Sequence, residues 1–491
     1  MSTLAVHPDR RTASATHTPA ESSTAWLRER GMGASVLVAA ISTTFGVVLL
    51  SATAFLAEIL RTNPYVGDSE TLAAVLAILS ILLIGVAVYV AAIVTANTFS
   101  TVIAGRTRRI ALMRLIGASA SSRRTEVARQ GLIVGVIGAA CGLVVGVALS
   151  ALGATIAVRM LPLGDIEFSA LRPEAVIPAV VVALTTWVSA WVGSRAVLAV
   201  TPLQALGTSV ESPHEVLVAK LARNTVAVAL LIIGGALIAL GVLAGLVTPL
   251  GVVVAFFGGI LSFTGLALGA TLIMPPVLRL VGRMFGASVP ARLAAENALR
   301  YPARSSRMAI GVVMGVTLVT MFAVALESSK AVLAASGGGE LPPEMEALID
   351  TFSAIMMGIV AISAVIAGVG LVNLLTLGVV QRRRELGLLR ALGVASSQVR
   401  RMVLLEAAHV TITATALGLL LGVVYGWAGA QSLLGSVPIP PEFAPATFVW
   451  PAVPVWPVVV IVAATAVLTL VATIIPTRLA TSVAPVEALV E

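Results

Sequence analysis

Charge and cysteine are the scarcest features of this 491-residue chain. Charged residues make up 11% of it and hydrophobic residues 58%, whereas roughly a quarter of a soluble domain is charged. So little polar sequence excludes a large soluble domain and predicts an integral membrane protein. The single cysteine, Cys141, excludes a disulfide within the chain, and it lies in an apolar run where we expect it to pack.

Sequence motifs for ATP hydrolysis, metal binding and nucleophilic catalysis are also missing. Neither of the two lysines, Lys220 and Lys330, belongs to a G-x-x-x-x-G-K-[ST] motif, so any ATP-driven work would need a separate ATPase subunit. The chain has no HExxH, no cysteine and histidine cluster and no GxSxG. We therefore predict no catalytic residue, no cofactor and no metal. His409, three residues after Glu406, is expected to make a buried polar contact and not to relay protons.

Long apolar runs dominate what is present, and each of ten runs is long enough to cross a bilayer. The predicted spans lie near residues 34–58, 72–104, 131–158, 174–200, 224–247, 250–282, 308–333, 351–380, 403–435 and 450–477. These spans predict an all-α polytopic membrane protein.

The distribution of basic residues predicts the orientation of these spans. With the N-terminus inside, only four of the 31 lysines and arginines fall outside, namely Arg61, Arg159, Arg172 and Lys330. Because positive charge concentrates in cytoplasmic loops, we predict a multi-pass protein of the bacterial plasma membrane with both termini cytoplasmic. The net charge of +8 then reflects membrane topology, and we predict no nucleic-acid partner.

One basic motif occurs twice, as RTRRIALMRLIGAS from residue 106 and as RRRELGLLRALGVAS from residue 382. A constant number of residues separates the matching positions of the two copies. We call this number, which is the separation of Arg114 and Arg390, the repeat offset. Pairs of identical residues at the repeat offset are Arg106 and Arg382, Arg108 and Arg384, Arg114 and Arg390, Gly117 and Gly393, Gly142 and Gly418, and Gly146 and Gly422. A constant offset over this length indicates an internal repeat.

The repeat divides the chain into four predicted parts. They are a disordered cytosolic tail over 1–24, a four-span repeat over 25–206, a linker with two spans over 207–290 and a second four-span repeat over 291–491. Because each repeat has an even number of spans, both insert in the same orientation as parallel repeats. The glycine pairs of each repeat, four residues apart, predict close helix packing.

Residues 382–401 predict a helical elbow. Leu386, Leu389 and Leu392 recur every three residues, as in a short amphipathic helix at the cytoplasmic surface. Gly393 is expected to end this helix in the left-handed conformation, and Ser396 or Ser397 to cap the next one. Contacts of the arginines with lipid headgroups would explain the charge but not the recurrence in register, so we favour contact with a partner protein.

The segment Glu-Leu-Gly-Leu-Leu-Arg-Ala-Leu-Gly over 385–393, a following GxxxG span and a closing Pro-x-x-Ala-Leu together resemble the FtsX-like permease family. The resemblance implies a permease subunit of an ATP-binding-cassette (ABC) transporter that exports a hydrophobic or amphipathic compound, peptide or lipid. It further implies coupling helices that dock on two copies of a separate ATPase, with one chain serving as a pseudo-dimer. The implied coupling residues are Arg106, Arg114 and Gly117 in the first copy and Arg382, Arg384, Glu385, Arg390 and Gly393 in the second.

Two features depart from the family pattern. Arg109 stands where the family usually has the acidic residue present here as Glu385, so we expect unequal docking sites. The predicted outer loops over 61–71 and 334–350 are too short for the large extracytoplasmic domain of the best-known exporters. A non-transporting signal or mechanotransmission scaffold that works with an ATPase is the alternative. An ion-coupled carrier is disfavoured because the spans have few ionisable residues near their centres.

Overall fold

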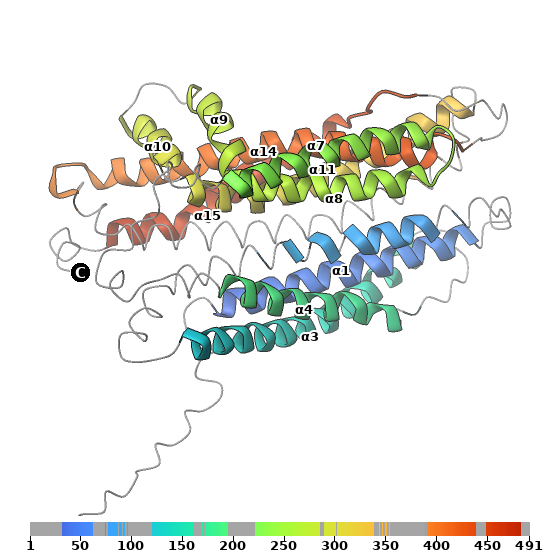
Figure 1. Cartoon of the computed structure of the whole chain (residues 1–491), viewed down its shortest axis with the longest axis horizontal. Coiled ribbons are helices and arrows are strands. Elements are labelled where there is room, and N and C mark those ends of the chain that lie inside the picture. The colour runs from blue at the N-terminus through green and yellow to red at the C-terminus, as the bar shows by residue number, and fades with distance from the viewer. Residues whose placement is uncertain are drawn as a thin grey trace, which may run out of the picture.

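The structure is a computed structural model in which every regular element of the described residues is a helix (Figure 1). It describes residues 32–61, 120–160, 172–194, 221–284, 289–300, 302–337, 390–437 and 448–482, together with 77–86, 88–90 and single residues at 74, 92, 93, 96, 169, 343, 346, 349, 350, 353 and 388. The elements are α1 (Met32–Arg61), α3 (Ala120–Met160), the 3₁₀ helix η2 (Pro173–Ala175), α4 (Val176–Gly193), α7 (Leu221–Gly245), α8 (Gly251–Leu268), α9 (Ala270–Gly282), α10 (Val289–Arg300), α11 (Pro302–Ser336), α14 (Ser396–Leu434) and α15 (Val455–Ser482).

Eight of the described helices are long and apolar enough to cross a membrane, namely α1, α3, α4, α7, α8, α11, α14 and α15. This confirms the prediction of an all-α polytopic membrane protein. The predicted span over 72–104 is described in part, and its residues 77–86 and 88–90 are helical. The predicted span over 351–380 lies almost wholly outside the described residues.

The predicted span over 250–282 is wrong as a single helix. α8 ends at Leu268, Gly269 takes a non-helical conformation and α9 begins at Ala270. The interruption falls on a glycine, which has a low intrinsic preference for helix. Pro275 and Pro276 lie inside α9, where they remove two backbone donors from that helix. In Figure 1, α9 runs steeply across the direction of α7, α8 and α14.

Other predicted boundaries also shift. α3 begins at Ala120, eleven residues before the predicted span. α14 begins at Ser396, seven residues before the predicted span, so it continues directly out of the elbow. α15 begins at Val455 and not at residue 450, because Pro451 and Pro454 disfavour helix in the residues before them.

Three hydrogen bonds to α11 and α14 fix the segment 448–454, which leads into α15. The Trp427 indole N–H donates to the carbonyl of Val449 at 2.7 Å, and the Val449 N–H donates to Oε1 of Gln431 at 3.0 Å. The N–H of Ala452 donates to the Ser328 hydroxyl at 3.2 Å. These bonds hold the segment across the ends of the preceding helix α14 and of α11, whose Ser328 is 124 residues away in sequence.

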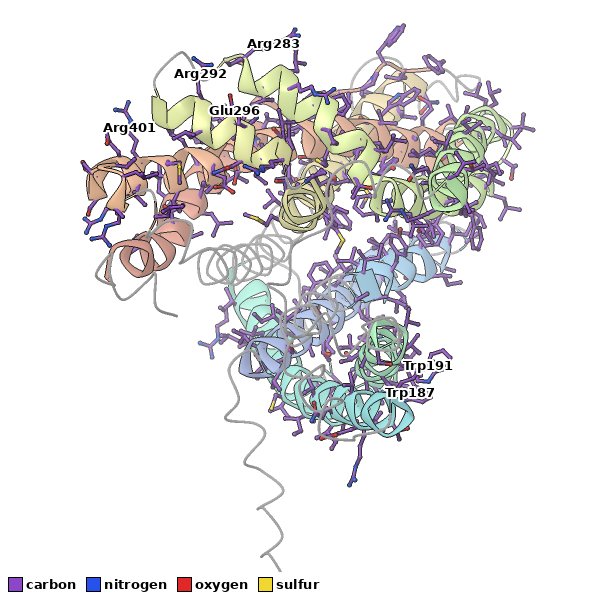
Figure 2. The ribbon with its side chains drawn as sticks, turned by 60° about the vertical axis from the view of Figure 1, so that its left-hand side comes forward. Trp187, Trp191, Arg283, Arg292, Glu296 and Arg401 are labelled. Atoms are coloured by element: carbon purple, nitrogen blue, oxygen red, sulfur yellow. The ribbon has the colours of Figure 1, made fainter. Side chains whose placement is uncertain are left out.

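The helices form two groups (Figures 1 and 2). α1, α3 and α4 lie together, and α7, α8, α11, α14 and α15 form the second group with α9 and α10 on its side. The main core joins the groups: Phe45 and Leu49 of α1 belong to the same buried cluster as Phe263 of α8 and Val313 of α11. α11 is the most buried candidate span, which makes it the centre of the second group.

Candidate coupling elbow and helix interfaces

The described part of the predicted elbow over 382–401 ends a helix at Gly393. The N–H of Leu392 donates to the carbonyl of Leu388 at 2.9 Å, and the N–H of Gly393 donates to the carbonyl of Arg390 at 3.1 Å. Gly393 has φ of 97°, a conformation that glycine adopts without steric cost. No atom lies within 4 Å of where its Cβ would be, so backbone conformation, and not space, selects glycine here.

The next helix is capped differently from our prediction. Ser396 and Ser397 do not precede α14 but form its first turn, and the N-cap residue is Ala395, in an extended conformation. Oε1 of Gln398 accepts a hydrogen bond from the Ala395 N–H at 3.0 Å. This is the glutamine half of a capping box, and it fixes the direction in which α14 leaves the elbow.

The elbow presents apolar side chains to its surroundings. Leu388 is 50% exposed and Leu392 74% exposed, and their spacing of four residues places them on one face of the helix. Arg390 between them is half-buried. The described end of this helix therefore has two exposed leucines on one face.

The elbow continues into a small core that it shares with α10 and α14. Ala294 of α10 packs with Val399, Met402 and Val403 from the first turns of α14, and Val394 of the elbow lies against this cluster. A displacement of the elbow is therefore transmitted to α10 as well as to α14, because packed interiors have little free volume.

A second contact joins α14 to α9. His409 is 1% exposed, and its Nε2 lies 2.7 Å from the carbonyl oxygen of Leu278. A carbonyl can only accept, so Nε2 carries the proton. The prediction of a buried polar contact for His409 is confirmed, and sequence reasoning missed that the partner is a backbone carbonyl 131 residues away.

We expect His409→Leu to lower the free energy of unfolding by about 1 kcal/mol, because it removes one hydrogen bond between α9 and α14. The matched variant His409→Gln keeps an N–H donor and should lose less. The midpoint of thermal unfolding in detergent, followed by tryptophan fluorescence, measures both. A leucine variant as stable as the glutamine variant would show that the contact contributes nothing.

The predicted packing glycines lie at two helix interfaces. In α3, a Cβ at Gly142 would lie 2.7 Å from the Cβ of Thr43 and would also collide with the carbonyl oxygen of Ala40; at Gly146 it would lie 2.8 Å from the Cβ of Val47. The Thr44 hydroxyl donates to the carbonyl of Gly142 at 3.1 Å. α1 and α3 thus approach so closely that no side chain fits at Gly142 or Gly146.

The interface between α14 and α11 has the same construction. A Cβ at Gly418 would lie 2.8 Å from the Cβ of Val316, and one at Gly422 would lie 2.8 Å from Cγ2 of Thr320. Val316 and Thr320 follow Ala40 and Thr44 by the repeat offset, which also separates the glycines themselves. The first and third helices of the two halves therefore meet in equivalent register.

α8 lies between two tyrosines that the sequence analysis did not single out. The hydroxyl of Tyr89 lies 3.1 Å from the carbonyl oxygen of Ile260 and 2.8 Å from Oγ1 of Thr264. The hydroxyl of Tyr425, in α14, lies 2.8 Å from Oγ of Ser262. Since residue 262 projects away from residues 260 and 264 on a helix, the two tyrosines hold opposite faces of α8.

Six of the predicted coupling residues lie outside the described residues: Arg106, Arg114, Gly117, Arg382, Arg384 and Glu385. Arg390 and Gly393 are described, and both lie in the elbow. Among the described residues, no group of three or more histidine, cysteine, aspartate or glutamate side chains could hold a metal ion.

Both copies of the basic motif lie in segments that match a known protein family. The family model "FtsX-like permease C-terminal" matches residues 81–202 and 357–485, just over half of the chain. The chain belongs to the FtsX-like permease family. The two matched segments of this FtsX-like permease begin at positions 81 and 357, which are separated by the repeat offset that also relates the glycine interfaces.

Three relatives share shorter stretches with this FtsX-like permease. The macrolide export ATP-binding/permease protein MacB of Shewanella sp. (strain ANA-3) is 33% identical over 105 residues, which cover 20% of this chain and 16% of MacB. The ABC transporter permease YtrF of Bacillus subtilis (strain 168) is 31% identical over 87 residues, covering 17% of this chain and 20% of YtrF. The uncharacterized ABC transporter permease YvrN of the same strain is 31% identical over 101 residues, covering 21% and 24%. The matches thus span less than a quarter of each relative's length.

Proposed function

We propose that this FtsX-like permease is the membrane subunit of an ABC transporter and that it exports a hydrophobic or amphipathic compound, peptide or lipid. The elbow around Gly393 carries the proposal, because it joins an exposed leucine pair to a rigid helix that crosses the membrane region. The names of the relatives support it: two of them are ABC transporter permeases and one combines a permease with an ATP-binding part.

In this proposal ATP is hydrolysed by a separate subunit, since the chain has no P-loop motif. Closure of two ATPase subunits would push on two elbows at the cytoplasmic face, one in each repeat. The residues proposed to receive that push are Arg106, Arg114 and Gly117 in the first elbow and Arg382, Arg384, Glu385, Arg390 and Gly393 in the second.

The packing of α14 supports a mechanical role for the second elbow. α14 runs without interruption from Ser396 to Leu434, and its glycine face lies against α11. A push at the first turn of such a helix is carried along its whole length, because close contacts leave it no room to bend. The two repeats would then rock against each other and open the path for the exported molecule.

The test is to purify the tagged chain from its native membrane in mild detergent and to determine the mass of the intact complex. We expect one chain with two copies of a P-loop ATPase, and ATP hydrolysis that an exported amphiphile stimulates. Two chains with two ATPase copies would retain the transporter but overturn the pseudo-dimer. A chain that is recovered alone, with no ATP-dependent activity when candidate ATPases are added, would overturn the proposal.

A further inference from the structure

α9 has an exposed face of mixed character. Leu272, Pro276 and Leu280 follow each other at intervals of four residues at the exposed side of this helix, and Met284 continues the interval just after its end. Leu280 is 63% and Met284 80% exposed. Because the helix breaks at Gly269, α9 runs across the direction of the spans, and this face runs across them with it (Figure 1). The result is a short apolar stripe on a helix that lies across the bundle axis.

Exposed arginines border this stripe. Arg279 and Arg283 lie next to it on α9, and Arg292 and Arg300 are exposed on α10, where Glu296 is the one exposed acidic residue of the helix. Figure 2 shows Arg283 and Arg292 at the outer edge of the molecule, on the side of α9 and α10. The exposed surface of the two helices is therefore strongly basic.

A helix with an apolar stripe, flanking arginines and an axis across the spans has the features of a helix in the membrane–water interface. Apolar side chains on such a helix enter the acyl region, while arginine stems lie along it and their guanidinium groups reach phosphate oxygens. A protein docked on the elbow would lie beyond the end of α14. α9 and α10 instead project sideways from the bundle (Figure 1).

We propose that α9 and α10 form a binding site for anionic phospholipid headgroups. Arg279 and Arg283 would pair with the phosphate groups, and Leu280 and Met284 would lie among the acyl chains. The site is joined to α14 by the hydrogen bond from His409 to Leu278 and by the packing of Ala294 on Val399. Bound lipid thus stabilises the position of α14 next to the elbow. The inference needs no ATPase and stands independently of the proposed function.

Native mass spectrometry of the full chain in detergent tests the binding, with phosphatidylglycerol and phosphatidylcholine as probes. In the variant R279Q/R283Q we expect the affinity of the tightest phosphatidylglycerol site to fall roughly 25-fold, because each arginine near a membrane surface contributes about fivefold. Phosphatidylcholine binding should not change. The charge-matched control R159Q/R172Q, at the other end of the spans, should retain wild-type affinity.

Unchanged phosphatidylglycerol affinity in R279Q/R283Q, or an equal loss in the control, would overturn the site in favour of diffuse charge attraction. Displacement of phosphatidylglycerol by excess inorganic phosphate would show a site for free phosphate and would likewise overturn a lipid site. Retention of the lipid in the presence of phosphate supports it.

A spin label tests the depth of α9 and does not depend on lipid affinity. The single cysteine is exposed, so a Cys141→Ser background with Leu280→Cys gives one labelled site. In vesicles of phosphatidylcholine with one quarter phosphatidylglycerol, we expect this label to be more accessible to oxygen than to a water-soluble nickel complex. A label at Ala391→Cys, on the exposed elbow, should show the reverse. Preferential access of nickel to the label at position 280 would place α9 in water or under a soluble partner and would overturn the proposal.

Discussion

Gly142→Leu is expected to abolish recovery of the folded chain. A first side-chain carbon at this position already lies 2.7 Å from the Cβ of Thr43, and the backbone of Ala40 blocks the remaining space. Leucine would force α1 away from α3, break the hydrogen bond from Thr44 to Gly142 and open the core around Val47. Overpacking of this kind costs about 1–3 kcal/mol where side chains can yield, and more where backbone must move. Size-exclusion profiles of the detergent-solubilised chain measure the recovery.

The same helix offers a matched control. Gly153 is exposed, and no atom lies within 4 Å of where its Cβ would be. Gly153→Leu should therefore give a normal profile, with a small gain from the better helix propensity of leucine. In the other half, Gly422→Ala should lower the unfolding temperature because its methyl group meets Thr320. Equal recovery of the Gly142 and Gly153 variants would refute the close approach of α1 and α3.

Gly393→Val is expected to fold normally and yet to lose most of the ATPase activity of the proposed complex, on the order of tenfold. The position is exposed and has open space around it, so packing is not disturbed. The φ of 97° is the source of the effect, because a left-handed conformation costs an ordinary residue roughly 1–2 kcal/mol and a β-branched residue more. The elbow would then rearrange and displace Leu388 and Leu392 relative to α14. The rate of ATP hydrolysis by the purified complex is the measurement.

The variant Gly393→Asn distinguishes an effect of the backbone conformation at this position from an effect of replacing glycine by any other residue. Asparagine tolerates positive φ better than other non-glycine residues, so this variant should retain considerably more activity than Gly393→Val. Both variants should unfold at the temperature of the parent chain. Equal activity of the two variants, or a large loss of stability in either, would show that the left-handed turn at Gly393 is not what the complex requires.

Composition and periodicity predicted the helical class and the approximate position of the spans, because an apolar run of sufficient length is typical of a helix that crosses a bilayer. The glycine pairs predicted close helix packing, and Gly146 lies on Thr44 as Gly422 lies on Thr320. The break after Leu268 was missed. Hydropathy is continuous through Gly269, and the proline pair that follows lies inside α9, so neither pattern marks the position of the break.

The candidate site was predictable only where its chemistry is local. The left-handed conformation of Gly393 follows from the sequence around it, and the buried contact of His409 from its position in an apolar helix. The N-cap of α14 is Ala395 and not a serine. Oε1 of Gln398 accepts from the Ala395 N–H, which is a different donor from the one that an N-cap serine would satisfy. A pair such as Tyr425 and Ser262 cannot be predicted from the residues around either member, because each is an ordinary polar residue within a span.

The position of α8 between Tyr89 and Tyr425 has a mechanical consequence. The residues they hold, Ile260, Ser262 and Thr264, lie within about 6 Å of each other along the axis, at 1.5 Å per residue. Helices that belong to different halves of the chain are thus pinned to α8 at a single level. If the two repeats rock as in the proposed function, these hydrogen bonds would place the pivot of that motion at α8. The ends of the repeats on one side of α8 would then separate as the ends on the other side approach each other.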